Sequence, residues 1–227
     1  MPLLGQAAML LGYDIVPEAI DLHDDWHTHE HFAERVSIPG FLRATRWVAI
    51  RGEPRYLVLY EVAQLDTLTS DAYRQRLDHP TPWTSRTMPH FRGMRRGFCA
   101  VTGSFGLGFG QLAAAIRFKP DAQSEASMRE WLLRDALPAL PAKPGIGSAH
   151  LLEAKGAPPM TREQRLRGAD AGVDWAIIVS GYGRDALADL APAGLGRTDL
   201  ERHGATGVVD ALYRFDYALT PDEVRRA

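Results

Sequence analysis

The stretch YLVLY at residues 56–60 is a short apolar run of aromatic and β-branched side chains, a composition typical of a buried β-strand. The stretch WAIIV at residues 175–179 has the same character. Continuous apolar runs of this kind indicate strands that are covered on both faces. We therefore expect a sheet with helices on one face and a second sheet on the other.

The surroundings of the two runs are also alike, which indicates an internal repeat. A strand followed by VPEA at residues 16–19 matches a strand followed by KPDA at residues 119–122, and Trp26 precedes Pro39-Gly40 as Trp131 precedes Pro144-Gly145. Each half then reads strand, helix, strand, strand, helix, strand. The expected elements are 6–14, 20–36, 41–51, 55–63, 65–77 and 92–104 in the first half, and 109–118, 124–140, 146–155, 173–181, 183–191 and 207–218 in the second.

This order predicts an α+β fold in which two ferredoxin-like βαββαβ repeats, residues 1–105 and 106–227, pack their antiparallel sheets together as a barrel within one chain. The tight hairpin at residues 53–55 corresponds to a long polar insertion that runs from residue 156 to residue 174. Because the partner sheet is supplied internally, a monomer is sufficient, and a homodimer of barrels stays open.

Bulk composition narrows the function classes. The chain has 227 residues, 26 basic and 28 acidic side chains and a net charge of −2. It therefore lacks the basic surface that nucleic acid or an anionic membrane would require, and a small-molecule ligand is the expected partner. With one cysteine, Cys99, no internal disulfide can form, and with no apolar run long enough to span a membrane we expect a cytoplasmic protein.

Three short motifs carry a family resemblance. They are HEHF at residues 29–32, IPGF at residues 38–41 and YLVLYE at residues 56–61. In this order they resemble the EthD-like branch of the dimeric α+β barrel superfamily, over about residues 7–105. The resemblance implies a small-molecule enzyme that transfers protons without a cofactor, as an isomerase, cyclase, dehydratase or monooxygenase-like protein. Its substrate would be apolar or aromatic and could be anionic.

His23, His27 and His31 recur at intervals of four residues and so share one face of the expected helix. Such a face could bind a metal if a carboxylate joined it, but a solvated helix start is the more ordinary interpretation for His23 and His27. His31 lies within the family motif. We take it as a candidate catalytic acid or base, oriented by Glu61 on the third strand, against the alternative of a structural histidine between helix and sheet.

Other candidate ligand contacts come from the second strand and its neighbours. Arg43 and Arg46 lie on opposite faces of that strand, so one of them is expected inside the barrel, where it would meet an anionic substrate or form an ion pair with Glu61 or Asp14. The apolar wall of the pocket, or alternatively a filled core, would be made by four aromatic side chains: Trp47, Tyr60, Trp83 and Phe91.

The polar cluster belongs to the first half. At the equivalent positions of the second half, His27, Glu30 and His31 are replaced by Leu132, Asp135 and Ala136. We therefore expect one asymmetric pocket, with the second half as scaffold or lid. Two other functions stay open: a binding protein for a hydrophobic metabolite, and a metal- or haem-dependent redox protein.

Overall fold

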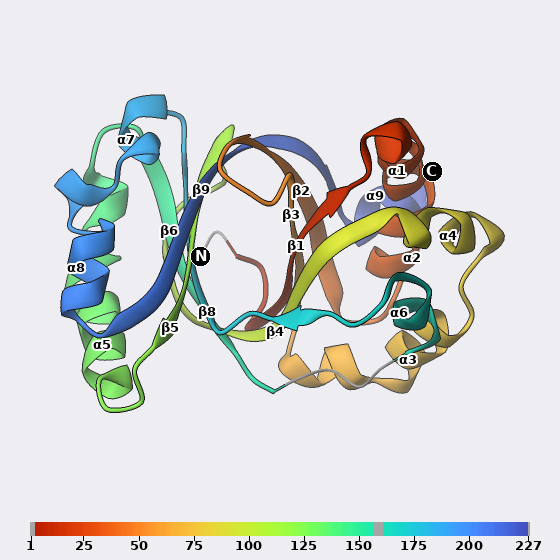
Figure 1. Ribbon diagram of the computed structural model, residues 1–227, viewed down its shortest axis with the longest axis horizontal. Helices are drawn as coiled ribbons and strands as arrows, with labels where there is room; N and C mark the ends of the chain where they lie inside the picture. The colour runs from red at the N-terminus through yellow and green to blue at the C-terminus, as the bar shows by residue number, and fades with distance from the viewer. Residues whose placement is uncertain (1–2, 157–160, 227) are drawn as a thin grey trace.

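The structure is a computed structural model that describes residues 3–156 and 161–226. Its centre is a closed antiparallel barrel of eight strands in the order β1-β3-β2-β9-β5-β8-β6-β4, with β4 pairing back to β1 (Figure 1). The strands are β1 (Ala7–Ile15), β2 (Phe41–Arg51), β3 (Tyr56–Val62), β4 (Phe91–Gly106), β5 (Leu112–Pro120), β6 (Ile146–Ala154), β8 (Trp175–Gly181) and β9 (Ala205–Leu219). The predicted fold class is thus confirmed.

Each half of the chain contributes four neighbouring strands in the same relative order. The halves are joined twice, because β4 pairs first with β1 and then with β6, while β9 pairs first with β5 and then with β2. β4 and β9 are the two longest strands, and each belongs to both sheets of the barrel.

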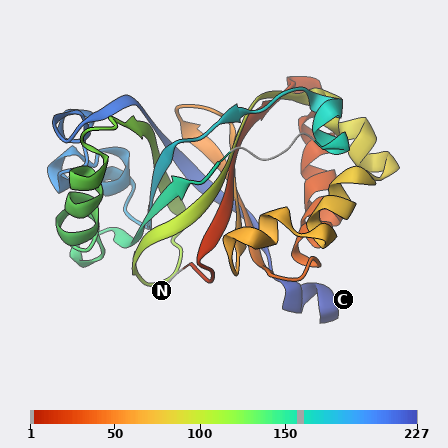
Figure 2. The same ribbon diagram turned by 90° about the horizontal axis from the view of Figure 1, so that it is seen from below.

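Helices cover the barrel on two opposite sides (Figures 1 and 2). On the first-half side lie α1 (Ile20–Trp26), α2 (Phe32–Val36), α3 (Asp71–Asp78) and α4 (Pro82–Thr87); on the second-half side lie α5 (Glu125–Trp131), α7 (Arg184–Ala188) and α8 (Arg197–Arg202). A π turn, His27–His31, joins α1 to α2, and a second π turn, Leu132–Ala136, follows α5. The C-terminal α9 (Pro221–Arg226) packs on α2. Within the described residues, no helix combines the length and apolar character that a membrane crossing requires.

The side chains of β3 point alternately into the helix layer and into the barrel interior, which are two separate compartments. Tyr56, Val58 and Tyr60 face the helices of the first half, whereas Leu57 and Leu59 face the barrel interior. Side chains of both faces are fully buried, so the strand shows no polar side. The molecule therefore has a barrel core and two separate helix–sheet cores.

The insertion of the second half does not stay on its own side. After β6 it forms α6 (Arg162–Arg167) and the two-residue β7 (Ala171–Gly172), which pairs with β4. α6 packs against α3 and α4, so a segment of the second half covers the helix layer of the first (Figure 1).

Candidate functional site

The polar face of the first long helix points inward. His23, His27 and His31 are 0%, 2% and 6% exposed, which contradicts the expectation of solvated His23 and His27. The π turn explains the difference, because its wider turn keeps positions 27 and 31 on one face where a regular helix would drift away from the sheet. The series continues with Arg35, again four residues on and buried.

The first histidine belongs to a hydrogen-bonded chain that runs from the surface into the core. Asp24 is partly exposed, and its Oδ1 lies 2.8 Å from Nδ1 of His23. Nε2 of His23 lies 2.9 Å from the hydroxyl of Tyr13. Because the carboxylate accepts the Nδ1 proton, Nε2 is the acceptor and Tyr13 donates to it. Tyr56 also donates to Asp24, at 2.7 Å.

His27 and His31 lie beside a cavity of about 30 Å³ between the helices and the sheet. Nε2 of His27 is 3.1 Å from the hydroxyl of Tyr60, whereas Nδ1 of His27 and Nδ1 of His31 have no hydrogen-bond partner among the described residues. The cavity has room for about two water molecules. Its wall is aromatic and methionine-rich, with Met9, Tyr13, Trp26, Tyr60, Met88 and Phe91.

Burial fixes the protonation states in this compartment. Desolvation, together with the neighbouring His23, holds the pKa of His27 well below its usual value, and desolvation together with Arg35 does the same for the pKa of His31. Desolvation raises the pKa of Tyr13 and of Tyr60. At neutral pH the cavity therefore presents neutral imidazoles, which accept protons, beside neutral phenols, which donate hydrogen bonds.

Buried ion pairs close the other side of the cavity. Nη2 of Arg35 lies 2.5 Å from Oε2 of Glu163 on α6, and Nη1 of Arg167 lies 3.7 Å from Oε1 of the same carboxylate. Arg96 of β4 reaches Asp170, with 3.0 Å between Nε and Oδ2. The insertion of the second half thus supplies both carboxylates that pair with Arg35, Arg96 and Arg167.

Glu61 lies in the other compartment and does not orient His31. Its carboxylate points into the barrel, where it accepts from Nε of Arg43 at 2.6 Å and from the backbone N–H of Leu4 at 2.6 Å. Strand alternation is the reason, because positions 60 and 61 of β3 face opposite ways and the helix meets the face of Tyr60. Arg43 is therefore the arginine inside the barrel, and its predicted ion pair with Glu61 is present.

The remaining predicted contacts divide between the compartments. Trp47 fills the barrel core. Tyr60 and Phe91 line the helix–sheet cavity, and Trp83 packs partly buried at the edge of the same core. Arg46 faces the helices but donates to Asp216 and Thr28, at 2.6 and 3.1 Å. The structure therefore does not assemble the predicted residues into one pocket.

A metal interpretation of the histidine face finds no support in the geometry. Both ring nitrogens of His23 are engaged, by Asp24 and Tyr13. Among residues 3–156 and 161–226, no group of three or more histidine, cysteine, aspartate or glutamate side chains is placed to hold a metal ion. The second half has the equivalent π turn, but Leu132 and Leu137 fill that position with apolar core.

The most important residues that sequence reasoning missed are Tyr13, Arg35, Arg96, Glu163 and Asp170. Arg35 could have been found, since it extends the spacing of the three histidines by one more step. The contact of Tyr13 with these histidines could have been predicted only if it were known which face of β1 meets the helices. The residues of the insertion gave no signal, because nothing in a polar loop indicates which half of the molecule it will cover.

The fold and the site together define a ferredoxin-like α+β barrel in one chain, with a cavity lined by histidines and tyrosines in the helix–sheet layer of its first half. No protein-family model matches the chain, and no curated protein matches it. Among solved structures, an anthrone oxidase-like protein superposes with a TM-score of 0.66 at 13% identity, over 97% of this chain and 96% of that chain.

Two further solved structures agree. A candidate monooxygenase from Fusobacterium nucleatum gives a TM-score of 0.57 at 7% identity, over 96% of this chain and 95% of that chain. A candidate chlorite dismutase gives a TM-score of 0.55 at 11% identity, over 97% of this chain and 98% of that chain. At these identities the likeness shows the fold alone, and membership of the EthD-like branch stays a prediction.

Proposed function

We propose that the chain is a small-molecule enzyme of the EthD-like type that moves a proton within the helix–sheet cavity, using its own side chains and no cofactor. The observation that carries the proposal is the pair of neutral, buried imidazoles of His27 and His31, whose Nδ1 atoms have no hydrogen-bond partner among the described residues, with Oε2 of Glu34 at 3.8 Å from Nδ1 of His31. Leaving a buried ring nitrogen without a hydrogen bond costs about 1–3 kcal/mol, which a catalytic or ligand-binding role would explain.

In this proposal His31 is the base. Its Nδ1 takes a proton from a methylene carbon that is conjugated through the aromatic rings with a carbonyl group of the substrate, and the electron pair of that C–H bond moves through the rings onto the carbonyl oxygen as an enolate. Neutral phenols and the guanidinium of Arg35 line the same cavity and favour the negative charge on that oxygen. The name of one structural neighbour, an anthrone oxidase-like protein, supports an aromatic ketone as substrate.

The test uses anthrone in deuterated buffer without oxygen, with loss of its acidic C–H signal followed by nuclear magnetic resonance. The protein is expected to accelerate exchange, and His31→Ala to reduce the accelerated rate by about a hundredfold, the scale of a lost general base. His29→Ala is the matched control, since His29 lies on the exposed side of the same turn. Full exchange in His31→Ala would refute the role of His31, and unchanged anthrone with every variant would favour a binding protein.

A second prediction concerns the chain Asp24–His23–Tyr13, which connects the solvent to the cavity wall. Tyr13 can accept a proton from the cavity while passing its own to His23, and the charge of Asp24 stabilises the imidazolium that results. Asp24→Asn is therefore expected to slow exchange about tenfold and to alter its pH profile, because it keeps the shape and removes the charge. Asp21→Asn, exposed on the same helix, should change neither. An unaltered profile in Asp24→Asn would show that protons reach the cavity by another path.

A further inference from the structure

The ion pairs beside the cavity do not balance in charge. Arg35, Arg96 and Arg167 contribute three positive charges, whereas Glu163 and Asp170 contribute two negative ones, and each of these side chains is 6% exposed or less. The next carboxylate outward, Glu34, is 19% exposed at the rim, 3.8 Å from Nδ1 of the neutral His31 and 4.0 Å from Nη1 of Arg76, so Arg76 balances its charge. A buried site with an excess cation favours an anionic group.

Arg96 shows the imbalance most clearly. Its Nε lies 3.0 Å from Asp170, yet Nε and Nη2 have no hydrogen bond of good geometry among the described residues. Asp170 is already shared, because Arg167 reaches both of its oxygens at 3.0 and 3.1 Å and Gln164 donates to it at 2.7 Å. Arg96 therefore has donors to spare in a place where water is largely excluded.

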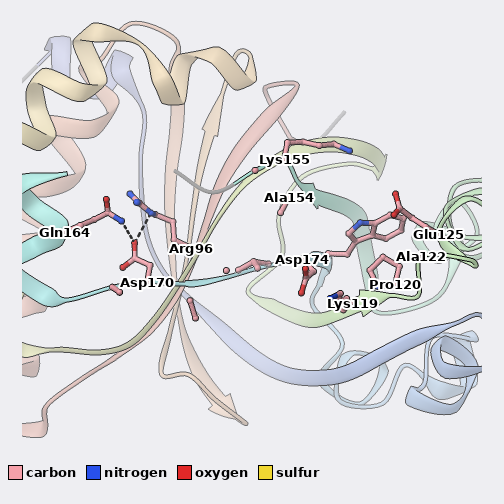
Figure 3. Close-up of a pocket in the computed structure, with 16 residues that line it drawn as sticks. Arg96, Lys119, Pro120, Ala122, Glu125, Ala154, Lys155, Gln164, Asp170 and Asp174 are labelled. Carbon is pink, nitrogen blue, oxygen red and sulfur yellow. Dashed lines mark hydrogen bonds and ion pairs between the residues drawn. The ribbon is translucent and has the colours of Figure 1, made fainter. Parts of the chain in front are cut away.

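Arg96 also stands where two spaces meet. It lines the small buried cavity and an open groove of about 640 Å³ on the surface. Figure 3 shows that groove, with Arg96, Gln164 and Asp170 at one end and Lys119, Lys155 and Asp174 of the second half along the rest. The groove has the size of a small-molecule site, whereas the cavity behind Arg96 holds about two waters.

α6, the segment between the groove and the cavity, is held in place mainly by ion pairs and hydrogen bonds of its buried polar side chains. The buried residues of α6 are Glu163 and Gln164, and its large apolar side chain, Leu166, is 37% exposed. Buried ion pairs add little net stability, because desolvation of the charges offsets most of their attraction. A competing anion that pairs with the same arginines would therefore displace the segment at small cost.

We propose that the groove and the cavity form one binding path for an aromatic carboxylate, whose anionic group pairs with Arg96 and Arg35, and that Glu163 holds the place of that group in the empty protein. The cavity of about 30 Å³ is too small for a ring system while α6 is in place, so displacement of α6 has to enlarge it before the aromatic part of the ligand packs on its ring-lined wall. This inference rests on the function proposed for the cavity and adds its substrate class and its gate.

The experiment compares naphthoate with naphthamide, which has the same ring system without the charge, by isothermal titration calorimetry. Glu163→Gln keeps the size of the side chain and removes the competing charge, so it is expected to tighten naphthoate binding about tenfold and to leave naphthamide within about twofold. Arg96→Gln in the Glu163→Gln background is expected to abolish that gain. Glu201→Gln, on the exposed surface of α8, is the matched control.

Three outcomes overturn the inference. Equal tightening of both ligands by Glu163→Gln would mean that α6 is a steric cover with no anion site beneath it, and no change for either ligand would mean that Glu163 does not hold the place of an anion. A gain that survives Arg96→Gln would remove Arg96 from the site. Because only binding is measured, the result is independent of anthrone exchange. If the protein binds naphthoate charge-selectively but does not accelerate exchange, the anion site stands and the proposed proton transfer is refuted. If it accelerates exchange without charge-selective binding, the proton transfer stands and the anion site is refuted.

Discussion

Lowering the pH from 7 to 5 is expected to remove about 4 kcal/mol or more from the free energy of unfolding, a large part of the total for a domain of ordinary stability. Four buried imidazoles have a lowered pKa. Three of them are the main cause, and the fourth, His23, contributes less because Asp24 opposes its desolvation. Desolvation holds the pKa of His27 and of His31 well below the usual value, and it lowers the pKa of His150, inside the barrel, to about 3.

The sign follows from proton uptake. In the unfolded chain these groups take up protons below a pKa near 6.5, whereas in the folded chain they stay neutral, so the stability is complete above that pH and is lost as the pH falls. Each group then loses about 1.4 kcal/mol per pH unit, or about 2 kcal/mol at pH 5. Burial raises the pKa of Glu34 and of Glu61, which works in the opposite direction and makes the net loss smaller than the histidines alone would give.

Urea denaturation at pH 7, 6 and 5 measures this effect. His27→Gln should make the free energy of unfolding depend less steeply on pH, by about 1.4 kcal/mol per pH unit, because it removes one of the three main groups. His29→Gln changes an exposed histidine in the same π turn. It should leave the pH dependence of the free energy of unfolding unchanged. A free energy of unfolding that stays constant from pH 7 to pH 5 would mean that the imidazoles are hydrated or charged in the folded protein.

Arg43→Met is expected to destabilise the protein by about 3–5 kcal/mol at pH 7, the scale for a buried carboxylate that loses its cation. Glu61 is fully buried in the barrel, and Arg43 donates to it at 2.6 Å while packing over the ring of Phe109. Without the guanidinium, Glu61 must ionise in an apolar core or take up a proton. The loss should therefore be smaller at pH 5, since burial already raises the pKa of this carboxyl.

The double variant Arg43→Met with Glu61→Leu should recover most of the stability, because apolar groups then fill an interior made of apolar side chains. Arg197→Met, which breaks an exposed pair with Glu201, is the matched control and should cost no more than about 0.5 kcal/mol. If Arg43→Met were as mild as that control, the barrel interior would have to be wetter than its burial indicates, and Glu61 would regain interest as a functional group.

The fold could be predicted from the sequence because its signals are local and occur twice. The two apolar strand runs and the repeated Trp-to-Pro-Gly spacing place most elements within a few residues of where they lie. No helix at α4 or α6 was expected from the sequence. α4 begins with Pro82 after the capping Thr81, between the elements expected at 65–77 and 92–104. Six-residue helices of this kind depend on caps and tertiary packing more than on any periodic pattern.

The candidate site could be predicted only in part. The spacing of the histidines correctly placed them on one face, but spacing alone does not tell whether that face meets water or a sheet. The role given to Glu61 depended on which side of β3 faces the helix. Since Leu59 and Tyr60 are both fully buried, no polar alternation distinguished the two faces, and the sequence could not decide between them.

The strand order has a consequence for synthesis of the chain. The edge of β2 is paired by β9, the last strand, and Arg46 meets Asp216 across a separation of 170 residues. Pairings between such distant segments form slowly, and they cannot form before β9 has left the ribosome. Until then the backbone of β2 is an open edge beside the bulky indole of Trp47, the kind of surface that another nascent chain can add to. Truncations that remove β9 should therefore yield aggregates and not a stable first half.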